Sequence, residues 1–201
     1  MISPYRLGDL VFMWVEEEDQ KLILSDYPDS IGAKFILEKR RNNHRDNVTI
    51  MYDIVSELLK RDNDIIPEDV NDSTVIHLRL GDVIAGTSDH EQGKRPLSVD
   101  YLKEGLKDNT DKKYVMGKCF FARASSTNYF ECVKKSNEYL QSVITELDAE
   151  YFDSGNADID LLFGIKSKLF VQGKGYFSKL IVFLRQRMGL PSIGCVTTTT
   201  L

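Results

Sequence analysis

Hydrophobic and polar positions change period repeatedly after about residue 70 of this chain. Short runs rich in β-branched and aromatic residues predict strands, and they fall at 73–84, 113–123, 151–153, 168–175 and 193–197. Segments with apolar residues every three or four positions predict helices between them, at 98–109, 128–150, 157–167 and 176–189. Strands and helices that alternate at this spacing are typical of right-handed βαβ crossovers. The pattern therefore predicts an α/β fold with a parallel sheet covered by helices on both faces.

Two of these helices have a clear apolar stripe that predicts which residues face the core. In the helix at 128–150 the stripe comprises Phe130, Val133, Leu140, Ile144 and Leu147. In the helix at 176–189 it comprises Phe177, Leu180, Ile181, Leu184 and Met188. Ser98 stands directly before the 98–109 segment and is the expected N-cap of that helix.

The first 70 residues are less regular than the rest. Helical spacing recurs at 7–18 and 48–62, and 21–28 has the pattern of a strand. The polar, proline-containing stretch at 63–74 is the best candidate for a boundary between two parts of the chain.

Polar residues and glycines follow several of the predicted strands. Asp82, Arg123, Asp153, Gly173 and Gly175 all occupy such positions. Ligands of parallel α/β sheets bind beyond the carboxyl ends of the strands. We therefore expect these residues to gather at one edge of the sheet and to form the binding site there.

Composition limits the classes of partner. The chain has 201 residues, of which 42% are hydrophobic and 28% charged, with a net charge of -5. This balance gives no general attraction to nucleic acid or to anionic membranes. No run approaches the roughly 20 apolar residues of a membrane span, and the N-terminus lacks the pattern of a signal peptide. Three widely spaced cysteines, Cys119, Cys132 and Cys195, form no disulfide framework or zinc pattern, so we expect a cytoplasmic protein.

The stretch VIHLRLGDVI (75–84) carries three polar side chains in an otherwise apolar strand. In an extended strand of period two, His77 and Arg79 share one face. A buried guanidinium requires a partner for its charge. Either Asp82 supplies a structural ion pair, or a ligand phosphate accepts two hydrogen bonds from the guanidinium fork.

A second candidate is VQGKGYFSKLI (171–181), which runs from a strand through two glycines into a helix. Gly173 and Gly175 allow backbone amides to approach a ligand, and Lys174 adds a positive charge next to the helix N-terminus. The stretch lacks the spacing of a Walker P-loop. It predicts a phosphate-binding turn, or else a glycine turn that only packs closely.

A third candidate is the pair Asp158 and Asp160 at the start of a predicted helix. These carboxylates suit the helix N-terminus without further function. They also suit a divalent metal on a nucleotide diphosphate, or hydrogen bonds from N1–H and N2–H of guanine.

Taken together, the three stretches resemble the fucosyltransferase superfamily, which includes the α-1,2-, α-1,6- and protein O-fucosyltransferases. HLRLGD is similar to its His-x-Arg-x-Gly-Asp motif, DLLFGIKSKLFVQGKGYFS to its C-terminal Asp, strand and turn, and YRLGDLVFMW to its first glycine loop. The resemblance implies a GT-B fold. Residues 1–70 would form a reduced N-terminal, acceptor-side portion, and residues 71–201 a Rossmann-like domain for a nucleotide sugar.

The resemblance also implies a reaction and its residues. The enzyme would move fucose from GDP-fucose to a glycan hydroxyl with inversion, without a metal or other cofactor. Arg79 and Asp82 would be catalytic, and the candidates for the base are Asp82, Asp9, His90 and Glu91. The donor would contact His77, Arg79, Asp158, Asp160, Gly173, Lys174, Gly175, Tyr176, Phe177 and Ser178. The acceptor side would include Arg6, Gly8, Asp9 and His90.

This chain departs from the family pattern at two positions of the turn. Gly175 and Tyr176 stand where family members often have Ser or Thr, so backbone amides and Lys174 would replace hydroxyl donors. Two other functions stay open at this point: a metal-dependent GT-A glycosyltransferase that uses Asp158 and Asp160, and a non-catalytic module that binds nucleotide sugars.

Overall fold

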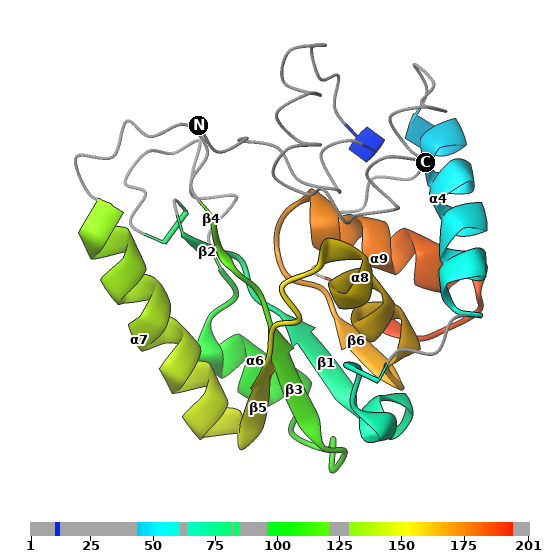
Figure 1. Cartoon of the computed structure of the whole chain (residues 1–201). Helices are drawn as coiled ribbons and strands as arrows, with labels where there is room; N and C mark the ends of the chain where they lie inside the picture. The colour runs from blue at the N-terminus through cyan, green and yellow to red at the C-terminus, as the bar shows by residue number, and fades with distance from the viewer. Residues whose placement is uncertain are drawn as a thin grey trace.

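Five parallel strands form the central sheet of the computed structural model (Figure 1). The structure describes residues 11–12, 44–60, 64–81, 83–84, 96–120 and 129–194. The strands are β1 (Thr74–His77), β3 (Lys113–Met116), β5 (Ala149–Phe152), β6 (Leu169–Val171) and β7 (Ser192–Ile193). Their spatial order is β5-β3-β1-β6-β7, so the chain proceeds from β1 to one edge, then returns beside β1 and continues to the other edge. This is a Rossmann-like arrangement.

Helices cover both faces of the sheet, as the sequence predicts (Figure 1). One face packs on α6 (Val99–Gly105) and α7 (Tyr129–Leu147), and the other on α4 (His44–Leu58), α8 (Ala157–Lys166) and α9 (Tyr176–Arg187). A short 3₁₀ helix, η1 (Glu68–Asp72), precedes β1. No helix in the described ranges is long and apolar enough to cross a bilayer.

Alternating residues of β1 supply the two hydrophobic cores. Val75 belongs to the core under α4, α8 and α9, and Ile76 to the core under α6 and α7. The first of these cores also contains Val11, Met51 and Leu184, so the described residues before position 70 pack with the C-terminal sheet. A division of the chain near residue 70 stays a prediction.

The predicted single strand at 73–84 is wrong in one respect, because the structure divides it. β1 ends at His77, and β2 (Leu80–Gly81) pairs with β4 (Cys119–Phe120) in a separate two-stranded sheet. The cause is a close crossing of backbones: a Cβ on Gly117 would lie 2.3 Å from the carbonyl oxygen of Leu78, and Gly117 has a φ of 150°. Arg79 therefore lies in the break between the two strands.

The predicted stripe of α7 is confirmed in its second half and wrong at its start. Leu147 is buried, and Leu140 and Ile144 are partly buried against the same core, whereas Phe130, expected in the core, is 86% exposed. The buried positions nearest the start of the helix are Cys132 and Ser136. Phe130 lies two positions before Cys132, which is roughly 200° around a helix of 3.6 residues per turn. The buried face includes a polar anchor, because the Ser136 hydroxyl oxygen accepts a hydrogen bond of 2.9 Å from the backbone N–H of Gly81.

Near the end of α9, Arg185 is completely buried. Its guanidinium donates hydrogen bonds of 2.6–3.2 Å to the carbonyl oxygens of Gly164, Ile165, Ser167, Lys168 and Pro191. The carbonyls at the end of α8 carry the partial negative charge of a helix C-terminus and so compensate the buried cation. Burial lowers the pKa of Arg185 to about 10, which leaves the guanidinium charged at neutral pH.

Candidate functional site

The strand order places β1 beside β6, and the connections that leave their carboxyl ends diverge. After β1 the next described helix is α6, on one face of the sheet, whereas after β6 the chain enters α9 on the opposite face. Neighbouring strands whose connections diverge in this way form a topological switch point, where open α/β sheets bind ligands. His77 ends β1, and the glycine turn at 173–178 follows β6.

Gly173 brings the glycine turn into direct contact with the end of β1. A Cβ at this position would lie 2.1 Å from the carbonyl oxygen of His77 and 2.7 Å from its Nδ1. Any other residue would force two backbone segments apart. The His77 ring is buried and faces Phe177, with 5.8 Å between ring centroids. The structure thus brings together His77, Gly173 and Phe177, which the sequence placed in one site.

Arg79 reaches the other glycine of the same turn. A Cβ on Gly175 would lie 3.8 Å from Cδ of Arg79 and 3.9 Å from its Nη1. Gly175 is the N-cap residue of α9, with a φ of 104° and no capping side chain. The guanidinium therefore lies at the N-terminus of a twelve-residue helix, whose first N–H groups lack partners within the helix. A cation beside free amides and a helix dipole suits an anion with several oxygen atoms.

The remaining residues of the turn have different roles. Ser178 is buried, and its hydroxyl donates to the carbonyl oxygens of Gly173 at 2.8 Å and of Gly175 at 3.1 Å. Its proton therefore stabilises the turn itself. Lys174 is partly exposed, and Tyr176 is 39% exposed and stacks on Phe12 at 5.5 Å.

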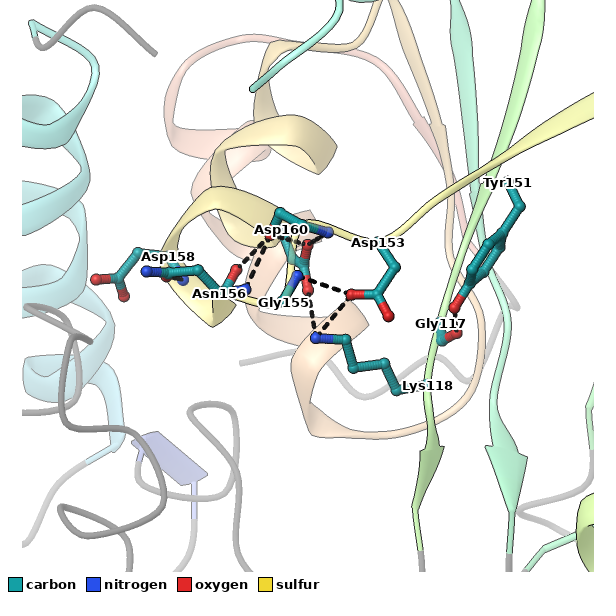
Figure 2. A network of polar contacts seen from close by, with 9 residues as sticks. Gly117, Lys118, Tyr151, Asp153, Gly155, Asn156, Asp158 and Asp160 are labelled. Atoms are coloured by element: carbon teal, nitrogen blue, oxygen red, sulfur yellow. Dashed lines mark hydrogen bonds and ion pairs between the residues drawn. The ribbon is translucent and has the colours of Figure 1, made fainter. Parts of the chain in front are cut away.

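The two aspartates of α8 occupy distinct environments, although both begin the helix as expected. Asn156 caps α8, with its Oδ1 accepting from the backbone N–H of Asp158 at 2.8 Å. Figure 2 shows the carboxylates of Asp158 and Asp160 pointing away from each other, as positions i and i+2 of a helix do. Asp158 is 5% exposed.

Asp160 is the centre of a polar network at the carboxyl edge, together with Lys118, Asp153 and Ser154 (Figure 2). One oxygen of Asp160 accepts from the Ser154 backbone N–H at 3.1 Å and from its hydroxyl at 2.5 Å. The other lies 3.6 Å from Nζ of Lys118, which also pairs with Asp153 at 2.8 Å. We call these four residues the Lys118 cluster.

The charges within the Lys118 cluster oppose the effect of burial. Burial raises the pKa of Asp160, and the hydrogen bond from Ser154 and the charge of Lys118 lower it only in part. For Lys118, burial lowers the pKa, but the hydrogen bond to Asp153 and the charges of both aspartates outweigh it, so the pKa is raised. Burial and then the nearby aspartates raise the pKa of Tyr151, whose hydroxyl donates to the carbonyl oxygen of Gly117, to about 12.

Sequence reasoning placed Asp153 at this edge but missed Lys118. Lys118 is the second residue after the end of β3, as Arg79 is after β1 and Gly173 is after β6. The sequence predicts one strand over 113–123, which includes Lys118, whereas β3 ends at Met116. Lys118 was therefore not recognised as a residue beyond the end of a strand. Among the proposed site residues, Asp82, Arg6, Gly8, Asp9 and His90 lie outside the described residues, as do Glu91 and Arg123.

Comparison with known proteins adds no family. No family model matches the chain, and no curated protein matches its sequence.

Proposed function

We propose that this chain is an inverting, metal-independent glycosyltransferase of the fucosyltransferase type that takes its sugar from a nucleoside diphosphate donor. The observation that carries the proposal is the position of Arg79 beside Gly175, at the N-terminus of α9 and the switch point of a parallel sheet. GDP-fucose is the donor that the resemblance of HLRLGD implies, and the GT-B fold belongs to the same proposal.

The reaction requires stabilisation of the departing diphosphate. As the bond between the anomeric carbon and the phosphate oxygen breaks, both electrons go to the oxygen, and negative charge grows on the diphosphate. Arg79, Lys174 and the first amides of α9 would stabilise that charge from preorganised positions. The acceptor hydroxyl would attack the anomeric carbon from the opposite side and lose its proton to a base, for which Asp82 is the first candidate.

The divergence of Asp158 and Asp160 favours the metal-independent reaction over the GT-A alternative. A shared divalent cation would need both carboxylates to converge on one point, whereas they point apart in Figure 2 and Lys118 lies beside Asp160. EDTA is therefore expected to leave transfer unchanged. Activity that EDTA abolishes and Mn²⁺ restores would support the alternative.

Calorimetric titration with GDP, UDP and their sugars tests the proposal. We expect GDP and GDP-fucose to bind more tightly than the uridine compounds. In a transfer or donor-hydrolysis assay, Arg79→Ala should lower the rate by about 100-fold or more, the effect of removing one donor from a charge-stabilising site. Arg187→Ala is the matched control, because Arg187 is exposed and contacts Thr49 and the Tyr52 ring away from the turn.

Three outcomes separate the possibilities. No binding of any nucleotide overturns the proposal. Binding of GDP-fucose without hydrolysis or transfer assigns a non-catalytic module. An Arg79→Ala protein that unfolds, but whose folded fraction transfers sugar at the wild-type rate, makes Arg79 a structural residue.

A further inference from the structure

We propose that Lys118 is a positioning residue of the nucleotide site, which holds the Asp160 carboxylate in place to accept N–H groups of the donor base. This inference rests on the proposed function and adds to it a residue that the sequence motifs do not contain. Lys118 would act through Asp160 and need not touch the substrate.

Lys118, Asp153 and Asp160 converge at the carboxyl edge of the sheet. Lys118 lies just beyond the carboxyl end of β3, Asp153 just beyond that of β5, and Asp160 within the first turns of α8. One ammonium group pairs with both aspartates, at 2.8 Å and 3.6 Å. Three segments that are separate in sequence are thereby fixed at the edge where parallel sheets bind ligands.

The two carboxylate oxygens of Asp160 differ in the hydrogen bonds that they accept. Each oxygen of a carboxylate has about two lone-pair positions. Ser154 donates twice to Oδ1 of Asp160, which fills that oxygen. Lys118 approaches Oδ2 at 3.6 Å, beyond the usual length of a hydrogen bond, so it attracts this oxygen without occupying a lone pair. Oδ2 keeps the capacity to accept from a base.

Gly117 fixes the backbone from which Lys118 extends. Gly117, directly before Lys118, passes against the backbone of Leu78, and its carbonyl oxygen accepts a 2.9 Å hydrogen bond from the Tyr151 hydroxyl. The backbone that carries Lys118 is thus held by contacts to the ends of β1 and β5.

Lys118 also affects the charge on Asp160. Within the described ranges, the titratable groups that face this carboxylate are Lys118, Asp153 and Tyr151, and the Asp158 carboxylate points away. Burial and Asp153 favour the protonated form of Asp160, and Lys118 is the cation that opposes them. A protonated carboxyl has fewer acceptor positions for guanine N–H groups, so Lys118 extends recognition to lower pH.

The test is the affinity for GDP, measured by calorimetry from acidic to neutral pH. In Lys118→Met the carboxyl of Asp160 should hold its proton to higher pH, so the midpoint for GDP binding should move upward. We expect about tenfold weaker binding on the acidic side for each pH unit of that movement, with affinity approaching the wild-type value towards neutral pH. Lys118→Arg should restore the wild-type profile, because it keeps the charge.

The matched control is Lys103→Met. Lys103 resembles Lys118 in exposure, at 49% against 44%, and pairs with Glu146 on the surface between α6 and α7. It should leave the pH profile unchanged. An unfolding curve at each pH separates loss of affinity from loss of folded protein.

Two failures are distinguishable. If wild-type protein binds GDP and Lys118→Met shows the same pH profile, Lys118 is only a structural tie between strands and the inference is overturned alone. If wild-type protein does not bind GDP at any pH, both the proposed function and this role are overturned.

Discussion

A lysine pairs with two carboxylates at each end of β3. The carboxylates at the amino end are more exposed to solvent than those at the carboxyl end. At the amino end, Lys112 pairs with Asp69 at 2.9 Å and with Glu150 at 3.1 Å, and these two acidic side chains are 46% and 62% exposed. At the carboxyl end, Lys118 pairs with Asp153 and Asp160, which are 34% and 13% exposed.

The difference in exposure is accompanied by a difference in the pKa values of Asp69 and Asp160. Hydrogen bonds from Lys112 and then from Tyr114 lower the pKa of Asp69, whereas burial raises that of Asp160. A surface network of this kind contributes little to stability, because water already solvates its charges. A buried carboxylate costs free energy unless it is compensated. Similar pairings at the two ends of one strand therefore shift the pKa of a carboxylate in opposite directions.

The largest effect on stability is expected from a substitution of Gly117, which directly precedes Lys118 at the carboxyl end of β3. Gly117→Ala would put a Cβ against the Leu78 carbonyl oxygen at a φ that alanine rarely adopts. We expect a loss of roughly 3 kcal/mol in the free energy of unfolding by urea, from overlap and backbone strain together.

Gly105→Ala is the control for Gly117→Ala, because no atom lies within 4 Å of the added methyl group at the end of α6. It should leave stability unchanged or raise it by about 0.5 kcal/mol. If both variants are equally stable, the close crossing of Gly117 and Leu78 is not a constraint on the fold.

A smaller effect is expected from the two lysines. Lys118→Met should destabilise by about 1 kcal/mol at neutral pH, because it leaves Asp160 buried beside Asp153, although solvent screens a partly exposed lysine and the bonds from Ser154 remain. Lys112→Met should change the urea midpoint very little, since its partners are exposed. A greater loss for Lys112→Met would reverse the comparison.

The smallest effect is a pair of opposite pH dependences, measured as the difference in unfolding free energy between wild-type protein and Asp→Asn variants. The folded pKa of Asp69 is below its ordinary 3.8, so Asp69 stabilises the fold above pH 3.8 and loses this contribution as the pH falls through the folded value. The folded pKa of Asp160 is above 3.8, so its relative contribution falls as the pH rises from 3.8 through the folded value.

Asp69→Asn should therefore remove a contribution that grows with pH, and Asp160→Asn one that declines with pH. The change with pH isolates ionisation, because altered hydrogen bonds shift each difference by a constant amount. If both free-energy differences changed with pH in the same direction, the distinction between the two ends of β3 would be wrong.

Much of the fold was predictable because local periodicity and the topology of parallel sheets agree. The alternation after residue 70, the Ser98 cap of α6 and the buried Leu180, Ile181 and Leu184 of α9 are all confirmed. The contact of Gly173 with His77 also follows from the rule that ligands and glycine turns meet at the carboxyl ends of strands.

The errors share a cause in contacts between distant segments. The break after His77 depends on Gly117 crossing Leu78, and the start of α7 turns Ser136 inward to meet Gly81 while Phe130 faces solvent. Neither contact leaves a periodic pattern. Lys118 was overlooked because its carboxylate partners come from two later segments. Arg185 was overlooked because a charged residue near a helix end ordinarily faces solvent.

Arg185 has a consequence far from where it lies. It joins α9 to the last turn of α8 and to the chain before β7, at the amino edge of the sheet. At their N-termini, α8 is capped by Asn156, beside the proposed base-binding residue, and α9 by Gly175, beside the proposed phosphate-binding residues. In the proposed function, Arg185 would fix the distance between the residues that bind the base and those that bind the phosphates, although it contacts neither part of the donor. A substitution that weakens this joint would then lower the affinity without changing any residue proposed to contact the donor.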